Sequence, residues 1–270
     1  MMNQFPLHKF FIHNGQIKSN SDFIVSENTG GVYEVIRVAN RVPLFVEDHL
    51  NRFYSSAKLA GHEIRFSKPD LENFINLLIL ENRIPEGNIL LSCKTNLKAF
   101  FITHNYPAKE WYEKGVACGI LHAERVNPNA KVFQTSVRQQ ADTLISQEGY
   151  YEVLLVDHKG HITEGSRSNL FFVKGNSLYT PPGKGVLLGI TRQKTIQLAH
   201  ELNYKVLEQD ILLNDLQLFD AIFITGTSPK ILPVDCVAGY KFDAQNRVVQ
   251  NLRIGYDQLI EQYIAAHPGN

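Results

Sequence analysis

The chain lacks the sequence loops that most often bind nucleotide phosphates. Neither the P-loop pattern GxxxxGK[ST] nor the dinucleotide fingerprint GxGxxG occurs in its 270 residues. No apolar run approaches the length of a transmembrane helix, and the first residues, MMNQFPLHKFF, lack the sustained apolar core of a signal peptide. We therefore expect no membrane partner and a cytoplasmic location, and any phosphate group must be bound by another arrangement.

An excess of charge and a set of metal ligands are also missing. Lys plus Arg and Asp plus Glu number 27 each, so electrostatics give no reason to expect nucleic acid as a partner. Cys93, Cys118 and Cys236 are scattered without CxxC spacing, which favours reduced thiols over disulfides or a zinc site. The ten histidines show no HExxH pattern. The expected partners are small molecules and a second copy of the chain, and no metal site is predicted.

Hydrophobic periodicity predicts a mixed α/β chain. Helices are expected at 47–61, at 69–82, from Thr191 onward and near the C-terminus, where Val249, Leu252, Tyr256, Leu259 and Tyr263 repeat at helical spacing. Strands are expected near 9–12, 23–25, 31–38, 89–91, 99–103 and 116–121, in a hairpin from Glu152, and in a run ending at Thr225. The polar stretch HNYPAKEWYEKG is the expected linker, so the predicted domains are 1–108 and 109–270.

The segment GYYEVLLVDHKGHITEGSRSNLFFVKGNSLYTPP contains the strongest single indication of function. Glu164 stands at the start of a Gly/Ser/Asn turn between two apolar strand candidates. Such a turn could hold the carboxylate rigidly at a sheet edge, where it can act on a ligand. A solvated corner between two strands is the alternative.

Two further segments could bind an anion. Thr191 is predicted as the N-cap of the helix in TRQKTIQLAHELN, and a helix N-terminus favours phosphate through its unpaired N–H groups and its dipole. The apolar run in AIFITGTSPKILPV stops at Gly226, Thr227 and Ser228, whose small side chains would let backbone N–H groups approach the same anion. An ordinary helix cap and a plain turn are the alternatives.

The helix candidate EDHLNRFYSSAKLAG carries a possible third contact. His49 and Arg52 are three residues apart and so share a face beside the apolar stripe, while Gly61 is the predicted C-terminal stop. An arginine there could bind phosphate oxygens with its forked guanidinium, or remain in water like most helix-surface arginines.

These segments together resemble a known enzyme family. GVYEVIRV, EDHLNRFYSSAKLAG, GYYEVLLVDHKGHITEGSRSNLFF, LLGITRQ and FITGTSPKILPV follow, in order, the motifs of the class IV aminotransferases. These fold-type IV pyridoxal 5'-phosphate enzymes include branched-chain aminotransferase, D-amino-acid aminotransferase and aminodeoxychorismate lyase. The resemblance, from about residue 30 to about residue 234, implies a small α/β N-terminal domain, a larger pseudo-barrel C-terminal domain and a homodimer.

The resemblance also implies the cofactor and the catalytic pair. Pyridoxal 5'-phosphate would be held by Lys131 as a Schiff base, since Lys114 lies too far upstream and Lys159 lies within a polar hairpin turn. The same lysine would then transfer the proton between the substrate and the cofactor. Glu164 would sit beside the pyridine nitrogen, because a neighbouring carboxylate keeps that nitrogen protonated.

The remaining site residues follow from the matching motif positions. Tyr33 corresponds to the active-site tyrosine of the early strand, and strand alternation puts Val35 and Arg37 on its face. Tyr33 and Arg37 are therefore the predicted substrate-binding residues. The predicted phosphate-binding positions are Arg52, Ile190, Thr191, Gly226 and Thr227.

The chain departs from the family in two places. Where relatives carry a Thr-Arg-Gly-like segment for the substrate carboxylate, this chain reads LLSCKTNLKAFFITHNYP, and the candidates left are Lys94, Lys98, Arg37, Arg138 and His104. The tyrosine expected five residues after the lysine in branched-chain enzymes is Ser136. Substrate chirality therefore stays open.

Three functions are compatible with these residues. The first is an aminotransferase that moves an amino group between an amino acid and a 2-oxo acid. The second is a lyase of the aminodeoxychorismate type, which uses the same lysine and cofactor but releases pyruvate. The third is a cofactor-binding or structural protein with a degenerate site.

Overall fold

The structure, a computed structural model, describes residues 5–25, 29–133 and 136–267. The chain divides into two compact units, each described by itself below. The first comprises Met1–Asn105, Ala130–Gln134 and Leu259–Asn270, and the second comprises Tyr106–Asn129 and Thr135–Gln258. The predicted domains, 1–108 and 109–270, differ from these units in assigning 106–108 to the first domain and 130–134 and 259–270 to the second.

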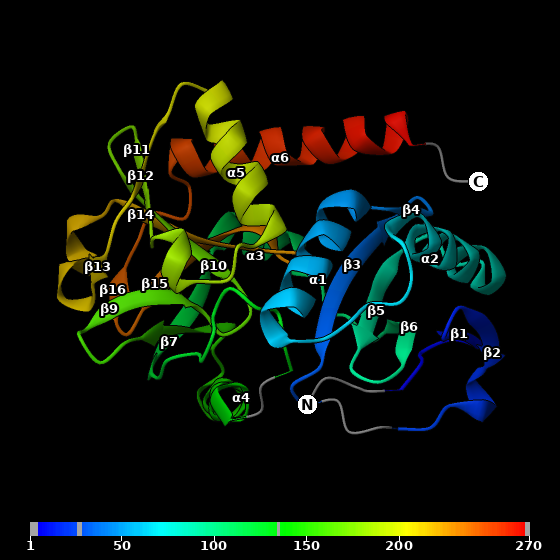
Figure 1. Ribbon diagram of the computed structural model, residues 1–270. Helices are drawn as coiled ribbons and strands as arrows, with labels where there is room; N and C mark the ends of the chain where they lie inside the picture. Colours follow the sequence, from blue (N-terminus) through cyan, green and yellow to red (C-terminus); the bar gives the residue numbers. More distant parts are fainter. Residues whose placement is uncertain (1–4, 26–28, 134–135, 268–270) are drawn as a thin grey trace. The chain divides into compact units, whose positions relative to one another are not determined.

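The first unit is built on a six-stranded sheet with the order β2-β1-β6-β5-β3-β4 (Figure 1). Its strands are β1 (Phe10–His13), β2 (Gln16–Ser19), β3 (Val32–Ala39), β4 (Val42–Pro43), β5 (Gly87–Cys93) and β6 (Leu97–Ile102). Two helices, α1 (Val46–Ala60) and α2 (Lys68–Asn82), pack against the sheet. Residues 20–22 form a short 3-10 turn.

The ends of α1 and α2 follow from local sequence. Gly61 ends α1 in the left-handed region at φ 71°, as predicted, because glycine adopts that conformation without steric cost. Ser67 and Asp70 form a reciprocal capping box at the start of α2, and Pro69 follows in its first turn.

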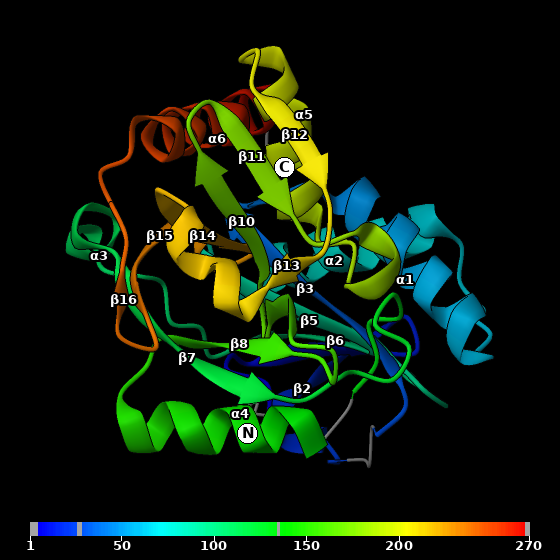
Figure 2. The same cartoon turned by 90° about the vertical axis from the view of Figure 1, so that its left-hand side faces the viewer.

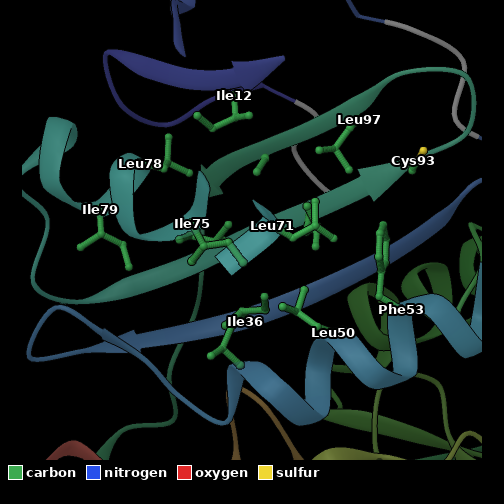
Figure 3. Packing of buried hydrophobic residues seen from close by; sticks show 14 of the residues in the cluster. Ile12, Ile36, Leu50, Phe53, Leu71, Ile75, Leu78, Ile79, Cys93 and Leu97 are labelled. Carbon is green, nitrogen blue, oxygen red and sulfur yellow. The ribbon is translucent and has the colours of Figure 1, made fainter. Parts of the chain in front are cut away.

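The main core of the first unit lies between the sheet and the two helices. Ile36 of β3 meets Leu50 and Phe53 of α1, and Leu71 and Ile75 of α2 complete the layer (Figure 3). All five side chains are buried. A smaller apolar cluster on the opposite face contains Phe11, Leu90, Phe100 and Ile102, with Phe23, Tyr33, Val35 and Phe133 packed against it. Side-chain alternation therefore gives β3 one core face and one face that carries Tyr33, Val35 and Arg37, as predicted.

The second unit contains a ten-stranded sheet with the order β12-β11-β10-β14-β15-β7-β8-β9-β13, and β16 pairs with β15. The strands are β7 (Val116–His122), β8 (Glu152–Val156), β9 (His161–Gly165), β10 (Asn169–Lys174), β11 (Ser177–Thr180), β12 (Lys205–Glu208), β13 (Ile211–Leu212), β14 (Ala221–Gly226), β15 (Lys230–Val237) and β16 (Tyr240–Lys241). Although β9 and β10 stand well apart in this order, they contact each other directly. The sheet therefore curls back on itself at the turn that follows Glu164.

Helices border this curled sheet. They are α3 (Lys109–Lys114), α4 (Ser136–Glu148), α5 (Ile190–Glu201) and α6 (Arg247–Ala266), whose last turns belong to the first unit. Helix α4 lies along β7 and β8 (Figure 2), and α5 packs on β12 and β14. Short 3-10 turns occupy 183–185 and 213–218. None of the described helices is long and apolar enough to cross a membrane.

The predicted mixed α/β class is confirmed, and two local predictions are wrong. Residues 23–25 are not a strand, because Phe23 turns inward onto Phe11 and Phe100. Thr191 is not the N-cap of α5, since Gly189 occupies that position and makes no side-chain cap bond. The division between the two units, after Asn105, falls within the expected linker, 104–115, which also contains α3. Helix α4 is a further element, for which the sequence gave no prediction.

Candidate active site

In the first unit, three ionisable side chains, Glu34, His49 and Arg52, form one group, in which Glu34 and His49 are buried and Arg52 is largely buried. Arg52 donates from Nε to Glu34 Oε1 and from Nη2 to Glu34 Oε2, both at 2.7 Å. His49 Nδ1 lies 2.8 Å from the same Glu34 Oε2. His49 and Arg52 therefore do share a face of α1, as their spacing predicts, and that face meets β3 at Glu34.

Electrostatics keep this group in a defined charge state. Burial by itself raises the pKa of Glu34, but the charge and hydrogen bonds of Arg52, with the hydrogen bond of His49, lower it from 4.5 to about 2. Burial lowers the pKa of His49, the hydrogen bond to Glu34 opposes that shift, and the charges of Arg52 and Lys131 lower it further. The group thus holds one carboxylate against the Arg52 cation, with Lys131 near enough to act on His49.

Lys131 is held beside β3 by its backbone. Its N–H donates to Ser56 Oγ of α1 at 3.0 Å, and its carbonyl accepts from the Tyr33 N–H at 3.0 Å. Its Nζ lies 4.7 Å from the centroid of the Tyr33 ring, and that ring stacks on Phe133 at 4.3 Å. The predicted catalytic lysine and the predicted substrate-binding tyrosine are therefore neighbours.

The residues predicted as candidates for binding the substrate carboxylate have different surroundings in the structure. Lys98 Nζ donates to the carbonyl of Ile24 at 2.7 Å and lies 4.8 Å from the Phe23 ring, so it ties down the chain at 23–24. Arg138 pairs with Asp142 within α4, at 3.1 Å. Arg37 is half-buried on the same face of β3 as Tyr33.

In the second unit, Glu164 is buried near the end of β9. Its side chain is 4 % exposed, Oε1 lies 3.3 Å from Arg125 Nε, and Oε2 accepts from the Leu187 N–H at 3.1 Å. The turn that follows it runs directly into β10, as predicted. A buried carboxylate between a cation and a backbone donor is not a solvated corner.

The N-terminus of α5 lies against the ends of β10 and β14. Ile190 and Thr191 are buried in its first turn, where N–H groups have no partner within the helix. A Cβ on Gly189 would lie 2.1 Å from Asn169 Oδ1, so glycine permits this approach without a shift of Asn169 or of the helix start. Asn169 is paired in register with Thr225, and the helix start therefore meets both strands.

One hydroxyl at this place lacks a protein partner. Thr225 is 1 % exposed, and its Oγ1 makes no hydrogen bond within the described part of the chain. A buried hydroxyl left unpaired costs free energy, which a ligand oxygen would recover. Gly226 and Thr227 follow Thr225 directly and begin the tight turn from β14 to β15. Pro229 belongs to the same turn and packs against Gly226. The sequence thus brings the second set of predicted anion contacts together within this unit.

The predicted site residues fall into two sets. Tyr33, Arg37, Arg52 and Lys131 belong to the first unit, and Glu164, Ile190, Thr191, Gly226 and Thr227 belong to the second. Among the described residues, no cluster of three or more potential ligands could hold a metal ion.

Sequence reasoning missed several residues that hold these sets in place. Glu34 had a visible signal, because alternation places a charged residue on the core face between Val32 and Ile36. Arg125 and Glu152, which contact the Glu164 turn, gave none, since their partners are distant in sequence or backbone atoms. Asn169 and Thr225 likewise become related only through strand pairing.

Known proteins resemble this chain over most of its length. The model of the family described as amino-transferase class IV matches residues 31–237. A D-alanine aminotransferase of Bacillus licheniformis is 29% identical over 259 residues, covering 84% of this chain and 88% of the relative. A probable branched-chain-amino-acid aminotransferase of Rickettsia felis is 27% identical over 255 residues, covering 87% and 88%.

Solved structures share the fold. The T.th. branched-chain amino acid aminotransferase with pyridoxamine 5'-phosphate superimposes with a TM-score of 0.85 at 24% identity, covering 96% of this chain and 97% of the other. The Escherichia coli branched-chain enzyme gives the same TM-score and identity, covering 94% of this chain and 95% of the other. The predicted fold type IV is confirmed by this likeness.

Proposed function

The chain belongs to the class IV aminotransferases, and on that premise we propose that it binds pyridoxal 5'-phosphate through Lys131 and transfers amino groups between an amino acid and a 2-oxo acid. Aminotransferase activity follows from the family. The cofactor, its lysine and the residues around it are the proposal.

The residues present fit such a group. Its phosphate needs several donors, and the start of α5, the Gly226–Thr227 turn and the unpaired Thr225 hydroxyl provide them in one place. In the first unit, Arg52 is a separate candidate for a phosphate contact, because Glu34 holds its guanidinium in a fixed orientation. The unpaired hydroxyl is the single observation that best supports this assignment, because no group in the described part of the chain satisfies it.

Each proposed residue then has a chemical task. When bound, the cofactor would act as an electron sink that stabilises negative charge at the substrate alpha carbon. Lys131 Nζ would bind the cofactor and serve as the base that takes and returns the alpha proton. Glu164 would hold a proton on the ring nitrogen, while Arg125 and the Leu187 N–H fix its carboxylate. Tyr33 and Arg37 would contact the substrate.

A labelling experiment tests the cofactor assignment. The purified protein is incubated with pyridoxal 5'-phosphate, reduced with borohydride, digested and mapped by mass spectrometry. We expect the modification on Lys131 and its loss in Lys131→Ala, with Lys159→Ala as the matched control that keeps it. Labelling of another lysine, or no labelling, contradicts the proposal.

The lyase alternative is not favoured, because the relatives described above are named as aminotransferases. A half-reaction separates the two activities. An amino acid supplied without a 2-oxo acid should convert the bound cofactor to pyridoxamine 5'-phosphate, whereas a lyase would release pyruvate from aminodeoxychorismate. Running D- and L-amino acids in parallel determines chirality, since relatives named for branched-chain amino acids and for D-alanine are about equally similar.

The proposal includes a homodimer and a cytoplasmic location. Exposed apolar side chains at Phe5, Leu7, Ile24 and Val25 support a second copy as the partner of the first unit. The three free cysteines support a reducing compartment. Sedimentation at low micromolar concentration tests the first, and a monomer there would contradict it. Fractionation of cells expressing the tagged chain tests the second.

A further inference from the structure

Glu152, the first residue of β8, is a buried carboxylate surrounded by hydrogen-bond donors. It is 2 % exposed. Oε1 accepts from Val153 N at 2.9 Å, from Ser166 N at 3.1 Å and from Ser166 Oγ at 2.6 Å. Oε2 accepts from Arg167 N at 3.1 Å and from Ser168 Oγ at 2.9 Å. These five donors are neutral groups, and four of them come from residues 166–168.

The turn after Glu164 is therefore folded around this anion. Gly165 N donates to the Ser168 carbonyl at 2.8 Å and closes the turn. A Cβ on Gly165 would lie 2.1 Å from Ser168 Oγ and 3.1 Å from Glu152 Cγ. The Glu152 side chain thus lies against the turn, and a side chain at 165 would first displace the Ser168 hydroxyl, which is one of the donors to Glu152.

A short series of contacts connects Glu152 with Glu164. Ser166, whose N–H and hydroxyl are held by Glu152, presents its carbonyl to Arg125 Nη2. Arg125 Nε in turn lies 3.3 Å from Glu164 Oε1. The orientation of the Ser166 peptide therefore determines where the Arg125 guanidinium lies, and that guanidinium is the charged partner of the Glu164 carboxylate.

We propose that Glu152 is a positioning residue for Glu164, acting through the folded turn at 165–168 and through Arg125. The inference rests on the proposed function, in which Glu164 keeps the ring nitrogen protonated. Only a group that accepts on both oxygens fits the five donors. A glutamine amide would present N–H groups to two of them, and an aspartate would fall one methylene short.

The test measures the ring nitrogen directly. Wild type and Glu152→Gln are loaded with pyridoxal 5'-phosphate carrying 15N in the ring, and the 15N chemical shift is recorded with kcat and KM. We expect a protonated-type shift in wild type, movement toward the unprotonated value in Glu152→Gln, and a kcat at least about tenfold lower, with KM within about threefold. Glu201→Gln, an exposed exchange on α5, should match wild type.

The outcomes separate this inference from the proposed function. A wild-type shift and kcat in folded Glu152→Gln overturn the inference, even if the melting temperature falls, because a purely structural role lowers only the latter. Should Glu152→Gln not fold, Ser166→Ala removes one of the five bonds and must move the 15N shift in the same direction; an unchanged shift overturns the inference. A wild-type protein not labelled at Lys131 overturns the proposed function first.

Discussion

Glu34 receives the Nε and Nη2 of Arg52 on its two separate oxygens, at 2.7 Å each, inside the core face of β3. This side-on arrangement fixes the plane of the guanidinium. Glu34 therefore fixes the direction in which the Arg52 guanidinium can contact a bound anion, although the carboxylate of Glu34 would itself repel that anion.

Replacing Glu34 with glutamine should destabilise the protein strongly. The change leaves the buried Arg52 without its counter-charge, and breaking such a pair costs on the order of 3–5 kcal/mol. Urea unfolding measures this loss. The control is Asp257→Asn, which breaks a partly exposed pair with Lys230 and should cost under about 1 kcal/mol. Similar losses in the two variants would contradict the buried-pair argument.

Acidification should destabilise the protein through the same group. The pKa of Glu34 is lowered from 4.5 to about 2 in the folded chain, so the unfolded chain binds the extra proton first as the pH falls. The stabilisation, about 3 kcal/mol, is complete above pH 4.5 and is lost as the pH falls toward about 2. The lowered pKa of His49 adds a loss below 6.5 in the same direction. Urea midpoints across this range should fall less steeply in Glu34→Gln than in wild type.

Glu164→Gln should abolish most activity while the cofactor stays bound. A neutral amide cannot hold a proton on the ring nitrogen, so kcat should fall about 100-fold or more. Absorbance of the bound cofactor after gel filtration measures retention. Glu261→Gln, an exposed exchange on α6, serves as the control. A Glu164→Gln enzyme with near-normal kcat would remove Glu164 from the proposed site.

Two substitutions at Tyr33 distinguish its ring from its hydroxyl. Lys131 Nζ lies over the ring at 4.7 Å, and such contacts are worth about 0.5–2 kcal/mol. Tyr33→Leu should therefore lower kcat/KM about 2- to 30-fold through the lost ring contact. Tyr33→Phe keeps the ring and should lose less. If Tyr33→Phe lowers kcat/KM more than Tyr33→Leu does, the hydroxyl of Tyr33 rather than its ring contributes to activity.

Gly189→Ala should weaken cofactor binding. The new Cβ would lie 2.1 Å from Asn169 Oδ1, so either Asn169 or the start of α5 must move. Because the first turn of α5 is the proposed phosphate contact, the dissociation constant for pyridoxal 5'-phosphate should rise about tenfold. Gly185→Ala, where nothing lies within 4 Å of the added carbon, is the matched control. Equal affinities in both variants would contradict the placement of the phosphate.

Residues near in sequence were the easiest to predict. Period-two alternation in β3 gave the face of Tyr33 and Arg37, and the three-residue spacing of His49 and Arg52 gave their common helix face. Helix α4 was missed because most of its residues are polar or exposed. Ala141 is the one buried residue of this helix, so no apolar stripe marks it in the sequence. Phe23 was assigned to a strand because it lies in a short apolar run. The sequence does not show that its side chain alone packs inward, onto Phe11.

The sequence by itself determined the order of motifs, and with it the family, the mixed α/β class and the candidate lysine and glutamate. Only the tertiary structure decided which groups hold those candidates. Glu34 accepts hydrogen bonds from Arg52, and Asn169 lies against Gly189 at the start of α5. Glu152 accepts hydrogen bonds from the turn beside Arg125. The physical reason is that a hydrogen bond or ion pair depends on distances of about 3 Å between atoms, and strand pairing and helix packing create these between residues far apart in the chain.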